Sequence, residues 1–286
     1  MKSDGNRGLT IRPFLKWVGG KRWLLKKRPL ILPNVFNCYF EPFVGSGAVY
    51  FFLNPSRAVL ADINRNVIET FVAVKLDPLG VEELLERHAD LHCADYYYSM
   101  RSCVPRSIVG RAARMIYLNR TCFNGVYRLN RAGVFNVPKG ARDDVVFEDD
   151  DFIRASEVLE RTELCCSDFE MVIDDSRRFD FVFADPPYTI LHNVNGFVKY
   201  NERLFSWNDQ IRLANCLERA LHRGVKILCT NADHASVREL YATRGFLLER
   251  ITRFSGIAAD ARKRNAFGEL LIKSPNLYNE RVVSPN

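Results

Sequence analysis

The chain has 286 residues, of which 47% are hydrophobic and 26% are charged, and its formal net charge is +7. This composition is typical of a soluble globular chain with one large domain, or one domain that carries an insertion. No apolar run approaches the roughly 20 residues that a membrane-spanning helix needs, and the N-terminus has no apolar segment typical of a signal peptide. We therefore expect a cytoplasmic protein with no membrane partner.

The eight cysteines include no Cys-x-x-Cys pair, and no histidine lies near them at the spacing of a zinc site. We expect reduced, mostly buried thiols and no bound metal.

Positive charge is concentrated in two stretches without acidic side chains, residues 5–40 and 111–142, and the second holds six arginines. Acid-free basic tracts suggest contacts with phosphate groups. Aromatic and amide side chains lie between the arginines of residues 117–128, and such residues read bases or wedge them apart. A solvated helix face is an equally good interpretation of either tract alone.

The first predicted elements are a strand, a glycine-bearing turn and a helix within residues 38–53, followed by a strand at 58–62 that ends in Asp62. Glycines let the backbone approach a ligand, and an acid at the next strand's end can bind ribose hydroxyls, so the pattern is typical of nucleotide-binding sheets. Alone it is a weak signal, because the third glycine of the dinucleotide fingerprint is missing.

Apolar spacing then predicts helices over residues 67–113, and the acidic stretch 143–151 marks a boundary. Further strands are predicted at 164–168, 179–184 and 225–230, with a closing hairpin of 246–254 and 267–273. Strands that alternate with helices favour an α/β sheet.

The tetrapeptide Asp185-Pro186-Pro187-Tyr188 directly follows the apolar strand 179–184. The prolines have no N–H and fix φ, so the carboxylate and the neighbouring carbonyls project in set directions, and Tyr188 offers a stacking surface. Such a group can hold an exocyclic amine, as on a nucleobase. The alternative is a strand that ends in a proline turn.

Five segments in this order resemble the Dam-type DNA adenine methyltransferases. They are residues 14–21, 41–47, 119–128, 135–138 and 185–188. The resemblance extends from about Pro13 to Lys273. It implies an α/β fold: a Rossmann-like S-adenosylmethionine-dependent methyltransferase sheet, residues 1–66 and 150–286, with an inserted, mainly helical target-recognition domain, residues 67–149.

The resemblance also implies roles for individual residues, with S-adenosylmethionine over the strand ends as methyl donor. Cofactor contacts are expected from Trp17, Lys21, Phe43, Gly45, Gly47, Asp62, Asp168 and Asp185. Catalysis is assigned to Asp185, Pro186, Pro187 and Tyr188. Contacts with double-stranded DNA, at GATC, are expected from Lys16, Arg120, Phe123, Asn124, Arg128 and Pro138. Trp17, Lys21 and Asp168 also have structural interpretations, as a core residue, a surface residue and a helix cap.

The chemistry agrees with these roles. The adenine amine is a poor nucleophile, and it is activated if Asp185 and the Pro186 carbonyl accept its two hydrogens. Because the amine is unreachable inside a duplex, the adenine should flip out and stack on Tyr188, while Phe123 fills or wedges the vacated stack.

Two features depart from the family pattern: Phe123 stands where many members have Tyr, and residues 189–193 lack the usual Pro-Leu-Ser. Arg262, Lys263 and Arg264, in the hairpin connection, are expected to touch phosphate or to form a basic loop with no partner.

Other functions remain as alternatives: an amine methyltransferase with a different DNA target or substrate, a dinucleotide-dependent oxidoreductase, or a DNA-binding module without catalysis. A cytosine-ring methyltransferase is a weak alternative because no Pro-Cys pair exists. We expect a monomer that acts alone or beside a cognate restriction endonuclease.

Overall fold

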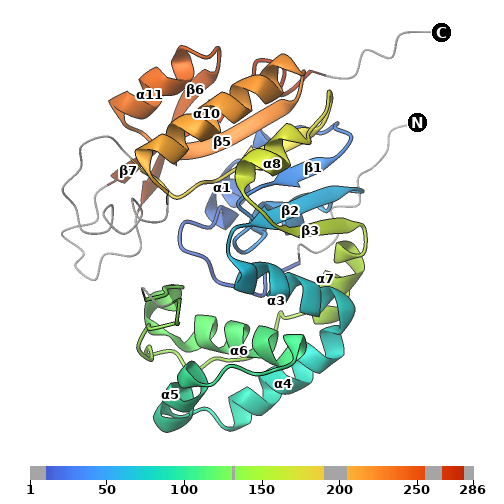
Figure 1. Ribbon diagram of the computed structural model, residues 1–286, viewed down its shortest axis with the longest axis vertical. Helices are drawn as coiled ribbons and strands as arrows, with labels where there is room; N and C mark the ends of the chain where they lie inside the picture. The colour runs from blue at the N-terminus through green and yellow to red at the C-terminus, as the bar shows by residue number, and fades with distance from the viewer. Residues whose placement is uncertain (1–10, 131–132, 190–204, 255–265, 280–286) are drawn as a thin grey trace. The chain divides into compact units, whose positions relative to one another are not determined.

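The computed structural model describes residues 11–130, 133–189, 205–254 and 266–279 (Figure 1). The chain divides into two compact units, which are described one at a time. Unit 1 comprises Met1–Pro29, Val44–Ser56 and Asn64–Cys166, and unit 2 comprises Leu30–Phe43, Arg57–Ile63 and Ser167–Asn286. None of the described helices is both long enough and apolar enough to cross a membrane.

The described residues form a seven-stranded sheet with the strand order β3-β2-β1-β4-β5-β7-β6. The strands are β1 (Tyr39–Glu41), β2 (Ala58–Asp62), β3 (Thr162–Cys166), β4 (Phe181–Ala184), β5 (Lys226–Ala232), β6 (Leu247–Phe254) and β7 (Ala266–Lys273). β1 pairs in parallel with β2 and β4, and β4 pairs in parallel with β5, whereas β7 runs antiparallel to both β5 and β6. The predicted α/β class and the closing hairpin are confirmed.

β4 begins two residues later than the apolar run suggested. Phe179 has φ +71°, outside the extended region. The Asp180 carboxylate accepts hydrogen bonds from the backbone N–H of Cys38 at 3.1 Å and of Arg177 at 2.7 Å. The chain therefore turns at these two residues and becomes extended only at Phe181.

Unit 1 is mainly helical, as the apolar spacing over residues 67–113 predicts. Its helices are α1 (Arg22–Lys27), α2 (Ala48–Leu53), α3 (Arg65–Leu76), α4 (Pro78–Asp90), α5 (Ala94–Ser102), α6 (Ile108–Thr121) and α7 (Phe152–Leu159), with a short 3-10 turn, η2, at Phe123–Gly125. Side chains cap several starts: Asn64 caps α3, Asp77 caps α4 ahead of a proline, and Ser107 caps α6. In Figure 1 α3 to α6 lie together.

In unit 2 the helices are α8 (Phe169–Asp174), α10 (Trp207–His222) and α11 (Ala235–Ala242), and η1 (Pro29–Ile31) precedes β1. α10 starts with a capping box in which Ser206 and Asp209 bond each other's backbone N–H. The central strands are fully buried, with Phe181, Val182, Ile227 and Leu228 at or near zero exposure. The core of unit 2 thus lies on β4 and β5, and it fixes the direction of the chain where β4 ends.

Unit 1 contains all of residues 67–149, together with segments on either side of them. The boundaries of a separate recognition domain therefore stay a prediction. None of the eight cysteines, all of which lie in the described residues, forms a disulfide, but only four of them (Cys38, Cys122, Cys216 and Cys229) are buried and three are exposed. The expectation of mostly buried thiols was therefore too strong.

Candidate active site

A row of acids lies at one edge of the sheet in unit 2. β2, β1 and β4 are neighbours and run parallel, so their carboxyl ends share that edge. Asp62 is the last residue of β2, Glu41 is the last residue of β1, and Asp185 directly follows β4. Ligands of open α/β sheets bind beyond the carboxyl ends of the strands, which makes this edge the candidate site in unit 2.

Two residues on the next two strands of the same sheet, β5 and β7, hold side chains of the tetrapeptide after β4. The Thr230 hydroxyl on β5 donates to Asp185 Oδ1 at 2.6 Å, and the Tyr188 hydroxyl donates to Glu269 Oε2, on β7, at 3.1 Å. Burial, then the charges of Asp185 and Glu269, raise the pKa of Tyr188 well above its usual range, so the phenol stays neutral.

An aromatic group follows β1 in the same unit. Phe43 stacks on Phe169 with ring centroids 5.4 Å apart and meets Phe205 edge-on at 5.7 Å. Aromatic faces of this kind suit the flat base of a nucleoside. Phe43 is thus held at the start of the turn that leads to Gly45.

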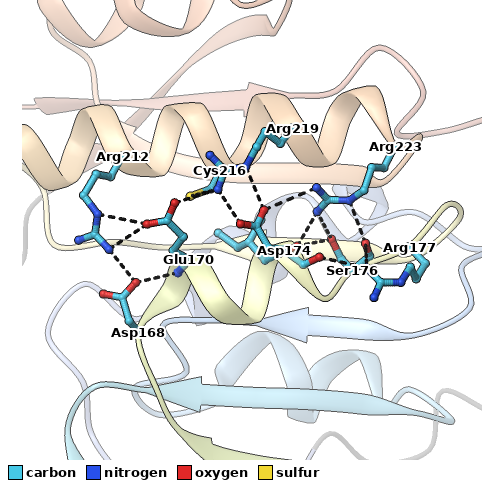
Figure 2. A network of polar contacts seen from close by, with 10 residues as sticks. Asp168, Glu170, Asp174, Ser176, Arg177, Arg212, Cys216, Arg219 and Arg223 are labelled. Atoms are coloured by element: carbon cyan, nitrogen blue, oxygen red, sulfur yellow. Dashed lines mark hydrogen bonds and ion pairs between the residues drawn. The ribbon is translucent and has the colours of Figure 1, made fainter.

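Asp168 lies at the start of α8, beside these rings. Its Oδ1 caps the helix by accepting from the backbone N–H of Glu170 at 2.9 Å, and the same oxygen pairs with Arg212 on α10 at 2.9 Å (Figure 2). The cap interpretation is confirmed, and the contact with a cofactor adenine stays a prediction. Farther along, Arg219 pairs with Glu170 and Asp174, so a ladder of ion pairs joins α8 to α10.

In unit 1, the turn that contains Gly45 and Gly47 packs against the indole of Trp17 at Gly45. Gly45 has φ +48° and Gly47 has φ +66°, and a Cβ on Gly45 would lie 2.7 Å from Trp17 Cδ1. Only glycine fits there without moving the indole. Trp17 also stacks on Tyr127 at 5.7 Å. Lys21 is buried, not a surface residue, and its Nζ donates to the Gly19 carbonyl at 2.7 Å.

The residues expected to read DNA meet in two adjacent loops of unit 1. The backbone N–H of Phe123 donates to the Pro138 carbonyl at 2.9 Å, and Arg128 Nε donates to Asn136 Oδ1 at 2.9 Å. Asn124 has φ +56° at the tip. Phe123 is 56% exposed.

Lys16 lies against the same part of unit 1. Its Nζ donates to the Arg120 carbonyl at 3.2 Å and sits 4.9 Å from the centre of the Phe147 ring. Partial burial, then the charges of Arg142, Arg120 and Arg12, lower its pKa to about 8. The ammonium group of Lys16 therefore lies within the electrostatic influence of three arginines, which favours its neutral form.

The motif that contains Arg120 predicted a contact with DNA, but the Arg120 side chain lies in the interior of unit 1. Its side chain is 0% exposed, and its guanidinium bonds both carboxylate oxygens of Asp150, at 2.5 and 2.8 Å, as well as the carbonyls of Phe14 and Val145. A side chain without exposed surface cannot contact a phosphate group or a base edge. We therefore remove Arg120 from the predicted DNA contacts.

Arg262, Lys263 and Arg264 lie outside the described residues, as do the residues at 190–193. Thr230 and Glu269, which bond side chains of the tetrapeptide, were not predicted from the sequence. Two signals were available: Thr230 stands in the predicted strand next along the chain, and Glu269 interrupts an otherwise apolar strand.

Comparisons with known proteins agree with this geometry. Residues 17–255 match the family described as D12 class N6 adenine-specific DNA methyltransferase. A type II methyltransferase of Lactococcus lactis subsp. cremoris is 36% identical over 89% of this chain and 93% of its own length. The DNA adenine methylase of Escherichia coli is 32% identical over 96% of this chain and 98% of its own length, and that of Haemophilus influenzae is 33% identical over 92% and 93%. The chain therefore belongs to the D12 class of N6 adenine-specific DNA methyltransferases.

Proposed function

We propose that this chain transfers a methyl group from S-adenosylmethionine to an adenine that has been flipped out of duplex DNA, within the sequence GATC. The observation that carries the proposal is the tetrapeptide that begins with Asp185, at the carboxyl end of β4, with its carboxylate held by Thr230 at 2.6 Å. A carboxylate fixed in this way is an acceptor aimed at an incoming amine.

The proposed chemistry follows from the acceptors that the tetrapeptide presents. The lone pair of the adenine amine is conjugated with the ring, so it must be redirected before it can attack. Asp185 and the Pro186 carbonyl each accept one amine hydrogen, which turns the lone pair out of the ring plane. S-adenosylmethionine would supply the electrophilic methyl group: the bond between that methyl and the sulfonium sulfur breaks as the bond to nitrogen forms, S-adenosylhomocysteine leaves, and the nitrogen then loses one proton to solvent. The carboxylate stabilises the positive charge that develops on the nitrogen as the new bond forms.

The residues present fit that cofactor in chemical type. In unit 2, Asp62 ends β2, where a carboxylate can bind ribose hydroxyls, and Phe43 offers an aromatic face. In unit 1, the turn of Gly45 and Gly47 presents backbone without side chains, beside the indole of Trp17. We propose that these five residues, with Lys21, Asp168 and Asp185, hold the cofactor.

We propose that the flipped base stacks on Tyr188. The neutral phenol is tethered by Glu269, so its ring is held in one plane. Phe123, exposed on a loop tip in unit 1, has the size and polarity to fill the vacated stack. The unstacking costs a few kcal/mol, which the contacts with the rest of the DNA must supply.

GATC is proposed as the target from the positions of Lys16, Asn124, Arg128 and Pro138, by their resemblance to the Dam-type family. The last three are exposed on the paired loops of unit 1, and Lys16 is partly exposed. An arginine bidentate to guanine would give roughly 1–3 kcal/mol of discrimination. We further propose that residues 67–149 carry target recognition. The protein would act as a monomer, alone or beside a restriction endonuclease.

The test is transfer of labelled methyl groups from S-adenosylmethionine to two duplexes that differ only in whether a GATC site is intact or scrambled. Label in the GATC duplex alone, recovered as N6-methyladenine, is the expected result. Equal label in both would overturn the target, and would favour an enzyme for other DNA sequences. An Asp185→Ala variant with full activity would overturn the role of the tetrapeptide.

A further inference from the structure

Two buried polar side chains, one on β5 and one on β7, bond the side chains of the tetrapeptide that begins with Asp185, entirely within unit 2. Thr230 is 0% exposed and Glu269 is 6% exposed. The Thr230 hydroxyl donates to Asp185 Oδ1 at 2.6 Å, and the Tyr188 hydroxyl donates to Glu269 Oε2 at 3.1 Å. The first and the last residue of the tetrapeptide are thus each hydrogen-bonded to one buried side chain of the sheet.

We propose that Thr230 is a positioning residue for methyl transfer: its hydroxyl fixes the orientation of the Asp185 carboxylate. The proposal rests on the role proposed above for Asp185 as acceptor of the amine hydrogens.

The orientation of the Asp185 carboxylate needs to be fixed because little energy is required to rotate it about the last torsion of the side chain. The terminal torsion of an aspartate has broad minima, so an untethered carboxylate samples many orientations. A short hydrogen bond from a buried hydroxyl to a charged oxygen is strong and directional. Thr230 uses only one of about four lone-pair positions on the carboxylate.

The backbone of Thr230 is itself rigid. It lies in β5, between β4 and β7, and pairs with Leu271 of β7, while its neighbour Cys229 pairs with Ala184, the residue before Asp185. The hydroxyl is therefore carried by the strand next to the one that ends at the tetrapeptide. A donor on a packed strand holds its partner more precisely than a donor on a loop.

The expected effect is on the rate of the chemical step. A hydrogen bond to a charged group that is lost in a buried place slows a reaction by about 10- to 100-fold if it matters in the transition state. We expect Thr230→Val, which keeps the shape but removes the hydroxyl, to lower the single-turnover methyl-transfer rate by that factor. The Kd for S-adenosylmethionine should change by less than about twofold, because Asp185 is only one of the eight residues proposed to hold the cofactor.

The conservative variant and a matched control complete the design. Thr230→Ser retains the hydroxyl and should restore the rate to within a few-fold of the wild type. Thr70→Val makes the same change at another fully buried threonine, whose hydroxyl bonds a carbonyl within α3, and should leave the rate unchanged. Thermal unfolding of each variant shows whether the protein is folded, and Thr230→Ala provides a second variant without the hydroxyl.

The outcomes separate this proposal from the one on which it rests. If Thr230→Val and Thr230→Ala both keep the wild-type rate, or if Thr230→Ser is as slow as Thr230→Val, the positioning role is wrong even though Asp185→Ala is inactive. If Asp185→Ala itself keeps full activity, the proposed function of the tetrapeptide fails first.

Discussion

The Asn119 side chain holds the main chain of Lys16 at both of its polar groups. Asn119 Oδ1 accepts from the Lys16 N–H at 2.7 Å, and Asn119 Nδ2 donates to the Lys16 carbonyl at 2.8 Å. Asn119 is fully buried at the end of α6. A helix of the predicted recognition segment therefore sets the position of a residue 103 places earlier in the chain.

Replacing Asn119 with alanine should destabilise the protein and blur its choice of target. Two backbone groups of Lys16 would lose their partner, at a cost of about 1–3 kcal/mol for each group left unsatisfied. Urea unfolding should show the loss, and the ratio of methylation of GATC to single-base variants should fall. Asn215→Ala is the control, because Asn215 bonds Arg244 in unit 2. Unchanged unfolding and target choice in Asn119→Ala would contradict the prediction.

Lys16 should make DNA binding depend on pH in the weakly alkaline range. Burial and the charges of Arg142, Arg120 and Arg12 lower its pKa to about 8, so the folded protein carries this charge below about pH 8 and loses it above. Affinity for a GATC duplex should therefore fall between pH 7 and pH 9 at constant salt. Lys16→Met should bind more weakly at pH 7 and show a flatter profile. The same profile in both proteins would show that another group titrates.

The stability contribution of Lys16 should change with pH in the opposite sense. The unfolded chain keeps this lysine protonated up to about its ordinary pKa of 10.5, whereas the folded chain releases the proton near 8. Between these values the unfolded state binds more protons, so the contribution to the free energy of unfolding rises with pH. Comparing urea unfolding of wild type and Lys16→Met at pH 7.5 and 9.5 measures the difference. A difference that falls over this range would contradict the sign.

The buried pair of Arg120 and Asp150 should govern stability, not DNA affinity. Removing one partner of a buried ion pair leaves an uncompensated charge and costs about 3–5 kcal/mol. Asp150→Ala should therefore lower the free energy of unfolding by about that amount, and Arg120→Met by a similar or smaller amount. Arg111→Met is a suitable control, because Arg111 pairs with Glu69 at a partly exposed place.

Salt dependence distinguishes this prediction from the earlier expectation that Arg120 contacts DNA. A phosphate contact contributes about one unit to the slope of log affinity against log salt. Folded Arg120→Met should keep the wild-type slope. A slope reduced by about one, with unfolding unchanged, would show that Arg120 reaches the DNA after all.

Sequence predicted the sheet well because its signals are local. The predicted strand 58–62, which ends in Asp62, has the predicted bounds, and the predicted strand before Asp185 ends at Ala184 as expected. The start of β4 was misplaced because Asp180 turns its side chain to cap two backbone N–H groups, an interaction that no periodicity reveals.

The supports of the site were less predictable, because they depend on which strands become neighbours. Thr230 is 45 residues from Asp185, and Glu269 is 81 residues from Tyr188. Arg120 was misassigned for a related reason. Its sequence motif showed only an arginine in a basic tract, which suggested a DNA contact. The burial of its side chain depends on the ion pair with Asp150, which lies 30 residues away in the acidic stretch 143–151.

The ion-pair ladder between α8 and α10 yields a prediction about cofactor affinity (Figure 2). Arg212 bonds the Asp168 carboxylate at 2.9 Å, whereas Arg219 bonds Glu170 and Asp174 but not Asp168. If Asp168 contacts the cofactor adenine, Arg212 orients that contact. Arg212→Ala should then raise the Kd for S-adenosylmethionine several-fold, measured by calorimetry, while the single-turnover rate at saturating cofactor changes little.

Arg219→Ala is the matched control for this prediction, because it removes an arginine from the same helix and the same ladder. Both residues are more than 40% exposed, so either substitution should cost no more than about 1 kcal/mol of stability. Arg219→Ala should therefore leave the Kd near the wild-type value. If both variants weaken cofactor binding equally, the prediction is wrong and the effect comes from the packing of α8. If Arg212→Ala binds the cofactor with normal affinity, the prediction is also wrong and Asp168 acts only as the cap of α8.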